Sequence, residues 1–249
     1  MDAEDFDRWY TDMAKSPAHQ EIQQRALGLP PELLSSSLLT WDGLGEVVEA
    51  LQLHSGQMFL DLACGRGGYG LEIARRTGAR MIGVDFSGVA VDLATGRAAA
   101  RGMADVAEFR VGDLIATCLD EASVDAVVCV DALQFALPVS AAIDECLRVL
   151  RPGGRLAVTC WEALDGADAR VPERIRQLDL AVQLPAAGFV DVRVADRPGW
   201  REAELRMWLE AAAVEPAGDP ALESMRDEGT RVLATFDARR RVFATAVRP

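Results

Sequence analysis

The sequence predicts an α/β fold: a doubly wound, seven-stranded sheet with helices on both faces, an antiparallel terminal strand and a helical N-terminal arm. From about residue 44 onward, short apolar runs alternate with helix-like segments, which is typical of parallel strands joined by crossover helices. The chain then closes on an alternating run, 241–247, which we interpret as the terminal strand.

The expected strands are short runs rich in Val, Ile, Leu and Phe. The first five are apolar nearly throughout, as strands are when helices cover both faces of a sheet. In chain order the strands are predicted at 58–63, 80–86, 107–111, 124–130, 155–161, 190–195 and 241–247.

The segments between the strands carry helix start and stop signals. Residues 67–77 follow a glycine turn and stop at Gly78, while 87–101 open on a serine that is suited to capping. Residues 139–150 end at a Pro-Gly-Gly triplet. Further helices are predicted at 172–187, at 220–236 and at 201–212, the last of which is expected to bury Leu205, Trp208, Leu209 and Ala212.

Residues 1–43 stand apart as a helical arm that is interrupted by Pro30 and Pro31. Such an arm either covers the open carboxyl edge of the sheet as a lid or packs on the flank of the sheet, and the sequence leaves both arrangements open. In the same way, Trp9, Tyr10 and Trp41 are either residues that close over a ligand or parts of the core.

Charge and composition exclude several classes of protein. The chain has 249 residues and a formal net charge of −13, so it lacks the basic face that nucleic acid or an anionic membrane surface requires. No apolar run has the length of a membrane span, and the acidic residues 1–12 do not resemble a secretory signal. The five cysteines are scattered, without a CxxC pair. We therefore expect a cytoplasmic protein with reduced thiols.

The strongest local signal is a glycine-rich turn where the first strand meets the first crossover helix. Residues 65–70 match the pattern GxGxxG, and Asp85 ends the next strand. Glycines let the backbone approach a ligand closely, and the N-terminus of a helix offers free N–H groups. The turn therefore predicts a nucleotide or nucleoside site, and by itself it also fits an NAD-dependent oxidoreductase.

Two further acids favour a positively charged nucleoside over a dinucleotide. Asp61 lies inside the first strand, where a buried carboxylate is costly without a partner and would repel a pyrophosphate. Residues 112–114, Gly-Asp-Leu, end the third strand and offer a carboxylate for an exocyclic amine beside an apolar cover for a purine. A ligand with an ammonium or sulfonium group suits these acids.

The order of these motifs resembles that of the class I S-adenosylmethionine-dependent methyltransferases, in particular the small-molecule, methyltransferase type 11-like branch. The motifs are represented here by Asp61, Ala63, Gly65 and Gly67, by Asp85, by 112–114, and by the segments 124–131 and 150–156. Ala63 stands where the family has a glycine, which adds one methyl group at a close approach. The resemblance covers residues 44–161 and implies a Rossmann-like domain, 44–249, with its cofactor half in 44–161 and its acceptor side in 162–249.

The resemblance also implies roles for single residues toward S-adenosylmethionine, whose product is S-adenosylhomocysteine. Asp61 is expected near the methionine portion, Asp85 on both ribose hydroxyls and Asp113 on the adenine amine. Asp131 and Gln134 are expected near the methionine ammonium or the acceptor. The expected cofactor-binding residues are Asp61, Ala63, Cys64, Gly65, Gly67, Asp85, Phe86, Ser87, Gly112, Asp113, Leu114, Asp131 and Gln134.

The expected activity is methyl transfer to an O, N or C atom of a small-molecule acceptor. The alternatives are the oxidoreductase named above and a non-catalytic S-adenosylmethionine-binding protein. A base is needed only where the acceptor must lose a proton, and His19, Tyr10 and Gln134 are weak candidates for a catalytic role. No metal site is predicted. The acceptor pocket is expected between the arm and the linkers after the fourth and fifth strands, including Trp161 and Glu162.

Overall fold

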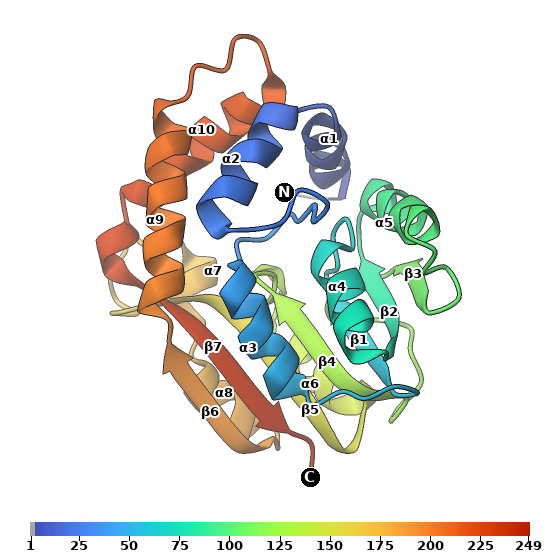
Figure 1. Cartoon of the computed structure of the whole chain (residues 1–249). Coiled ribbons are helices and arrows are strands. Elements are labelled where there is room, and N and C mark those ends of the chain that lie inside the picture. Colours follow the sequence, from blue (N-terminus) through green and yellow to red (C-terminus); the bar gives the residue numbers. More distant parts are fainter. Residues whose placement is uncertain (1–2) are drawn as a thin grey trace.

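The structure is a computed structural model that describes residues 3–249. Its centre is a seven-stranded sheet in the order β3-β2-β1-β4-β5-β7-β6 (Figure 1). Strands β1 to β5 are parallel, and β7 is antiparallel to both of its neighbours, β5 and β6. The strands are β1 (Met58–Leu62), β2 (Arg80–Asp85), β3 (Ala107–Val111), β4 (Val124–Val130), β5 (Leu150–Ala163), β6 (Val190–Asp196) and β7 (Arg239–Val247). The predicted seven-stranded, doubly wound fold with an antiparallel terminal strand is confirmed.

Helices cover both faces of the sheet, and each face has its own apolar core. Phe59 and Val128 belong to the core beneath α3, α4 and α9, whereas Leu60 and Val127 belong to the core beneath α6 and α8. This alternation explains why β1 and β4 are apolar throughout. The helices are α1 (Ala3–Ala14), α2 (Pro17–Leu27), α3 (Trp41–Leu51), α4 (Gly68–Thr77), α5 (Gly88–Ala100), α6 (Val139–Val149), α7 (Glu173–Arg176), α8 (Leu180–Ala186), α9 (Pro198–Ala213) and α10 (Pro220–Leu233), with 3-10 turns η1 (Leu133–Phe135) and η2 (Phe236–Ala238).

The strand order reverses between β1 and β4, and this reversal locates the site. In an open parallel sheet, the crossover helices leave β1 and β4 toward opposite faces, so a crevice forms outside their carboxyl ends. These ends point toward the helical arm at the top of Figure 1. The topology therefore places the segments that follow β1, β2 and β4 around one crevice.

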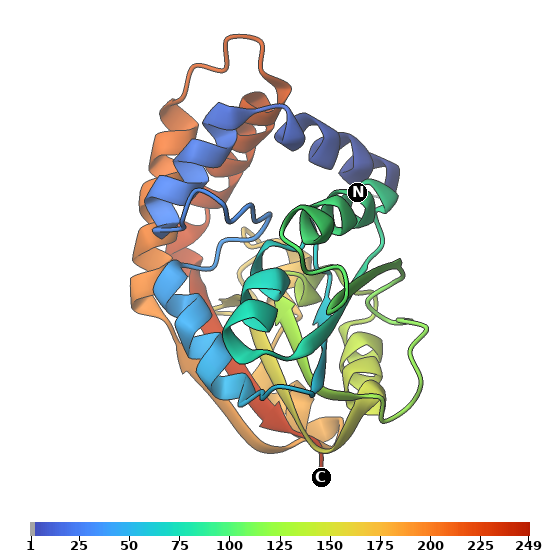
Figure 2. The same cartoon turned by 45° about the vertical axis from the view of Figure 1, so that its right-hand side comes forward.

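The arm extends from the edge of α5 to α9 and α10 (Figure 2). Helix α1 contacts α5 and α10, and α2 packs along α9, so the arm is joined to both ends of the crevice. Helix α3 begins at Trp41, so the predicted boundary at residue 43 falls inside a helix. The division into an arm or lid, 1–43, and a methyltransferase domain, 44–249, stays a prediction.

Three predicted elements differ from the structure. The helix expected at 172–187 is two short helices, because Asp179 caps a new one by accepting the Val182 N–H (3.3 Å). The strand expected from residue 155 begins at Leu150, directly after α6. The expected buried face of α9 is correct in part: Trp208 is buried and Leu205 packs partly on the core, whereas Leu209 is 55% exposed and Glu204 is buried beside Trp208. A prediction from the spacing of apolar residues could not place the acidic Glu204 on the buried face of this helix.

No helix within residues 3–249 is long and apolar enough to cross a membrane. Four of the five cysteines are buried and all five are free thiols, and Cys118 is the exposed one. The scattered, mostly buried thiols that the sequence predicts are therefore present.

Two glycines of α3 give a matched test of how tightly this helix packs. A Cβ at Gly43 would lie 2.7 Å from Leu39 Cδ1 and 2.8 Å from the Trp200 ring, whereas a Cβ at Gly45 meets nothing within 4 Å. Gly43→Ala is expected to lower the free energy of unfolding by about 1–3 kcal/mol through overpacking. Gly45→Ala should raise it by roughly 0.5–1 kcal/mol, because alanine is the better helix former. Urea unfolding measures both, and equal effects would contradict this packing.

Candidate functional site

The turn between β1 and α4 is held in place by Asp85 at the end of β2. Gly65 adopts a left-handed backbone conformation (φ 52°), and its N–H donates to Asp85 Oδ2 (2.8 Å). The Ser87 N–H donates to Asp85 Oδ1 (3.0 Å), at the point where α5 begins. Both carboxylate oxygens therefore bind backbone, and the Asp85 side chain is only 3% exposed. Burial raises its pKa in spite of these two hydrogen bonds.

Asp61 lies under the same turn and is only 4% exposed. A Cβ at Gly70 would lie 2.3 Å from Asp61 Oδ2, so only glycine fits at this point of α4. Burial, followed by the nearby Asp85 carboxylate, raises the pKa of Asp61 to about 7. Burial is the main cause of the raised pKa of both acids, and a positive charge nearby would oppose this effect.

A segment that we call the strap, residues 34–39, lies directly on the glycine turn. Tyr69 donates its hydroxyl to the Leu39 carbonyl (2.6 Å), and the Arg66 guanidinium donates to the Ser35 carbonyl (2.7 Å). A Cβ at Gly68 would lie 2.3 Å from the Leu34 carbonyl oxygen, so the close approach of the strap requires glycine there. The strap is therefore fixed to the turn on which it lies.

A small cavity of about 20 Å³ remains between the strap, the arm and the turn. A Cβ at Gly65 would lie 2.8 Å from Ser36 Oγ and 3.0 Å from the Tyr10 hydroxyl, so these two side chains occupy the space above the turn. The cavity is lined by Tyr10, Ser35, Ser36, Ser37, Asp61, Ala63, Cys64, Gly65, Gly68, Tyr69 and Val130. A nucleoside needs several hundred Å³, as small-molecule pockets generally do. The cavity as it stands is therefore smaller than a nucleoside, because Tyr10 of α1 and Ser36 of the strap occupy the space above the turn.

Helix α1 also covers the far end of the crevice. Phe6 packs edge-on against Phe86, with 4.9 Å between ring centroids. Asp7 accepts hydrogen bonds from the Ser87 hydroxyl and from the Val89 N–H (3.4 Å), at the N-terminus of α5. An acid at a helix N-terminus is favoured by the helix dipole, so these contacts stabilise the covered arrangement.

The residues expected at the adenine end do not line the cavity. Asp113 is exposed and accepts the Ile115 N–H through Oδ1 (3.0 Å), which is a turn contact. Leu114 packs against the core beneath α6, and Gly112 donates its N–H to the Asp85 carbonyl (3.0 Å). A Cβ at Gly67 would meet Ala94 and Phe109 at 3.1 Å, so Gly67 is a packing position for α5 and β3. Their roles toward a ligand stay predictions.

Asp131 and Gln134 follow β4, as expected, but their side chains bind protein groups. Asp131 accepts the Leu38 N–H of the strap (2.9 Å) through Oδ2 and the Thr159 hydroxyl (2.7 Å) through Oδ1. Gln134 donates to the Asp131 carbonyl (2.6 Å). Both side chains are beside the crevice and outside the small cavity.

The three weak catalytic candidates lie in different places. Tyr10 is in the cavity, and burial raises its pKa well above the usual value. Gln134 lies outside it, and its Oε1 has no hydrogen-bond partner within residues 3–249. His19 is buried in α2 outside the cavity. Burial and the Arg66 charge lower its pKa to about 4, which makes it a weak base.

The two residues expected in the acceptor pocket point to opposite faces of the sheet. Trp161 packs against Phe236 on the face of α9, with ring centroids 5.3 Å apart. Glu162 accepts the Leu180 N–H (2.8 Å) and pairs with Arg240 (2.6 Å), so it holds α8 on the other face. The expectation for Glu162 was wrong, because neighbouring residues of a strand alternate between faces.

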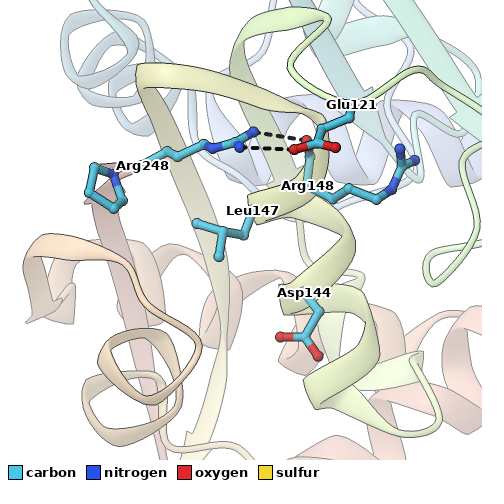
Figure 3. Close-up of a pocket in the computed structure, with 6 residues that line it drawn as sticks. Glu121, Asp144, Leu147, Arg148 and Arg248 are labelled. Carbon is cyan, nitrogen blue, oxygen red and sulfur yellow. Dashed lines mark hydrogen bonds and ion pairs between the residues drawn. The ribbon is translucent and has the colours of Figure 1, made fainter.

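A larger cavity, of about 430 Å³, lies at the opposite end of the sheet (Figure 3). Arg248 extends across it toward Glu121 (3.4 Å), and Arg248 also donates to the Arg148 carbonyl (2.9 Å). None of the residues predicted for the site lines this cavity, which is bordered by Glu121, Asp144, Leu147, Arg148, Arg248 and Pro249. Arg248 and Glu121 pair at this cavity, whereas the buried acids Asp61 and Asp85 lie at the glycine turn.

Comparison with known proteins agrees with this geometry. Residues 59–154 match the family model described as a methyltransferase domain. Over these residues the chain is similar to S-adenosylmethionine-dependent methyltransferases. It is 31% identical over 143 residues to the sterol 24-C-methyltransferase of Saccharomyces cerevisiae, a match that covers 56% of this chain and 37% of the yeast protein.

Solved structures share the fold over nearly the whole chain. Phosphoethanolamine N-methyltransferase 2 of Haemonchus contortus superimposes with a TM-score of 0.77 at 19% identity, covering 92% of this chain and 56% of that one. The [4+2]-cyclase SpnF gives 0.72 at 23% identity, covering 96% and 93%. Geranyl diphosphate C-methyltransferase of Streptomyces coelicolor gives 0.66 at 16% identity, covering 94% and 98%. At these identities the likeness shows the fold alone.

Several residues of the site were missed from the sequence: Ser35, Ser36, Ser37, Tyr69 and Val130, which line the cavity, and Arg66, which binds the strap. The serine run 35–37 before α3 was a usable signal, because consecutive small polar residues between a proline turn and a helix are typical of a segment that approaches a ligand.

The raised pKa of Asp61 predicts a pH-dependent stability. The folded protein keeps this proton up to about pH 7, while the unfolded chain loses it near pH 4, so folding is stabilised below pH 4 and loses that stabilisation as the pH rises to 7. Asparagine has no proton to lose in this pH range, so the variant Asp61→Asn does not lose stability in this way. The difference in unfolding free energy between variant and wild type is therefore expected to shift in favour of the variant from pH 5 to pH 8. Urea titrations at each pH measure the difference, and a constant difference would contradict the assignment.

Proposed function

We propose that this protein binds S-adenosylmethionine in the crevice above the glycine turn and transfers its methyl group to a small-molecule acceptor. The observation that carries the proposal is the pair of buried acids, Asp61 and Asp85, under the turn. The pKa of each is raised in this crevice, which supports a ligand that brings positive charge. A dinucleotide would bring a pyrophosphate toward the same acids, so the oxidoreductase alternative is disfavoured.

The residues of the chain fit this cofactor, which supplies a methyl group that is already activated by the positive sulfur. Asp61 offers its carboxylate to the positive portion of the ligand. Asp85 retains free lone pairs for ribose hydroxyls, because each of its oxygens accepts one backbone N–H. Ser36 and Tyr10 bring hydroxyls to the opposite wall of the crevice. The arm excludes water when it covers the crevice, and this favours a displacement at carbon.

The acceptor side supports a largely apolar small molecule. Exposed apolar side chains occur in the segments after β4 and β5, where Phe135 is 39% exposed, Leu137 74% and Leu164 63%. An exposed apolar patch at the edge of a crevice is typical of a binding surface. The matched relatives are named for sterol, phosphoethanolamine and geranyl diphosphate, and the net charge of −13 favours a neutral or cationic acceptor. We propose a cytoplasmic location, which the free, mostly buried thiols support.

Transfer of the methyl group requires its own test, because SpnF shares the fold and is named as a cyclase. The protein is incubated with S-adenosylmethionine that carries a labelled methyl group and a panel of apolar alcohols, amines and isoprenoids. Labelled product with any acceptor supports the proposal. Tight binding of S-adenosylhomocysteine with no transfer across the panel would favour the non-catalytic alternative.

The role of Asp85 is tested by cofactor binding. Asp85→Ala is expected to weaken S-adenosylhomocysteine binding by roughly 1–3 kcal/mol, because it removes charge-assisted hydrogen bonds to the ribose and to the turn. Calorimetry measures the affinity, with NADH as the comparison ligand. Unchanged affinity in the variant would refute the ribose role, and binding of NADH in place of S-adenosylhomocysteine by the wild type would refute the cofactor.

The role of Asp61 is tested by the pH dependence of affinity. A positive ligand binds the carboxylate form, and the pKa of about 7 means that Asp61 is largely protonated at pH 6 and ionised at pH 8. The affinity for S-adenosylmethionine is therefore expected to rise with pH through this window, by up to roughly tenfold per pH unit. Asp61→Asn should flatten the profile. A wild-type affinity that is constant from pH 6 to pH 8 would contradict the role.

A further inference from the structure

Arg241 is a buried guanidinium whose task the fold alone does not explain. It lies near the start of β7, paired in register with Trp161, and its side chain is 0% exposed. Its Nη2 lies 2.5 Å from Asp131 Oδ1, and its Nε lies 3.6 Å from Glu204 Oε2. One arginine thus joins an acid from the end of β4 to an acid from α9.

Glu204 holds the other side of this arginine. Its Oε1 accepts the indole N–H groups of Trp161 (3.0 Å) and Trp208 (3.3 Å), so it is fixed by two rigid side chains. Glu204 is 1% exposed, and burial raises its pKa to about 7 against the lowering effect of Arg241. Glu204, which the two indoles hold in place, therefore fixes the position of the Arg241 guanidinium.

Asp131 connects this cluster to the strap. Its backbone is left-handed (φ 59°), which is uncommon outside glycine and costs free energy that its surroundings must offset. Its carboxylate has three partners: Arg241, the Thr159 hydroxyl and the Leu38 N–H of the strap. Ser37 adds a hydrogen bond from its hydroxyl to the Val130 carbonyl (3.1 Å). The end of β4 and the strap are thus joined at two successive residues.

The cluster is poorly suited to a purely stabilising role. Glu204 Oε2 and all three guanidinium nitrogens of Arg241 lack a well-aligned hydrogen bond within residues 3–249, so Arg241 meets Asp131 and Glu204 as ion pairs. A buried ion pair with unsatisfied atoms is commonly no better for stability than apolar residues of similar volume. By contrast, Arg241 is one of the groups that contact the Asp131 carboxylate, and Asp131 holds the strap at Leu38, in addition to the contacts of Tyr69 and Arg66.

We propose that Arg241 is a positioning residue of the cofactor site: with Glu204 behind it, Arg241 orients Asp131 so that Asp131 holds the Leu38 N–H and fixes the strap on the glycine turn. This inference rests on the proposed function, because the strap forms a wall of the proposed cofactor crevice. Because Glu204 lies on α9, the proposal also means that a helix of the acceptor side helps to position the strap, which is a wall of the proposed cofactor crevice.

The test uses two double variants of the full-length protein. Glu204→Gln with Arg241→Met removes both ion pairs of Arg241 without leaving an unpaired charge on α9. The control is Glu162→Gln with Arg240→Met, which removes a partly exposed pair (2.6 Å) that joins β5 to β7 on the opposite face of the sheet. Hydrogen exchange of the peptide that contains Leu38, S-adenosylhomocysteine affinity by calorimetry and thermal unfolding are measured for both and for the wild type.

The first double variant is expected to exchange faster at Leu38 and to bind S-adenosylhomocysteine roughly tenfold more weakly, the scale of a lost charge-assisted hydrogen bond in a binding site. The control should leave both properties unchanged, whatever its unfolding temperature. Wild-type exchange and affinity in the first variant, or equal losses in both, would overturn the positioning role.

A milder variant keeps the test decisive if the double variant does not fold. Thr159→Val removes only the hydroxyl that Asp131 Oδ1 accepts, and it should accelerate Leu38 exchange in the same direction by a smaller factor; unchanged exchange would count against the proposal. Failure of the wild type to bind S-adenosylhomocysteine would refute the proposed function, while Leu38 exchange would still report on the positioning contact.

Discussion

The site is organised by the burial of two carboxylates at the point where the strand order of the sheet reverses. Asp61 lies one residue before the end of β1 and Asp85 ends β2, so the two acids are brought together by the parallel pairing of these strands. Neither is exposed to solvent by more than a few per cent. Charges in such a place are unfavourable unless hydrogen bonds or a counter-charge compensate them. Hydrogen bonds from backbone N–H groups to Asp85 determine the geometry of the turn. The need for a counter-charge supports the proposed positively charged ligand.

The glycines of the turn follow from this constraint. Asp85 accepts N–H groups from both Gly65 and Ser87, so the chain must fold back over the end of β2. Gly70 admits the Asp61 carboxylate against α4, and Gly68 admits the strap. Each glycine is therefore required for a different reason. Gly70 makes room for an acid, Gly68 makes room for a backbone carbonyl, and Gly65 adopts a left-handed backbone conformation. This division of tasks explains why a GxGxxG pattern alone does not identify the ligand.

Most of the sheet and the acids of its first two strands could be predicted, because they depend on local patterns. Apolar runs, a glycine turn and an acid at a strand end are visible in a single stretch of sequence. The strap and the cluster around Arg241 could not be predicted, because their partners come from distant segments. Leu38 binds Asp131 from β4, and Glu204 is tolerated in a buried face only because Trp161 and Arg241 reach it from β5 and β7. Asp113 shows that a local motif can also mislead a prediction. The motif is visible in the sequence, but the Asp113 side chain accepts a hydrogen bond within its own turn.

The unsatisfied polar atoms of the molecule lie where these distant segments meet. Among residues 3–249, the buried side chains with an unpartnered nitrogen or oxygen are His19, Ser36, Arg66, Ser123, Gln134, Glu204 and Arg241. All except Ser123 belong to the arm, the strap, the glycine turn or the acceptor side. Buried polar groups without partners reduce stability, so their concentration at one edge of the sheet is a cost that the rest of the fold must offset. The opposite edge has no comparable cost, because its arginines bind backbone carbonyls and exposed acids. Such an imbalance is expected where a site is built for a ligand, since a ligand or a moving arm supplies the partners that the folded chain does not.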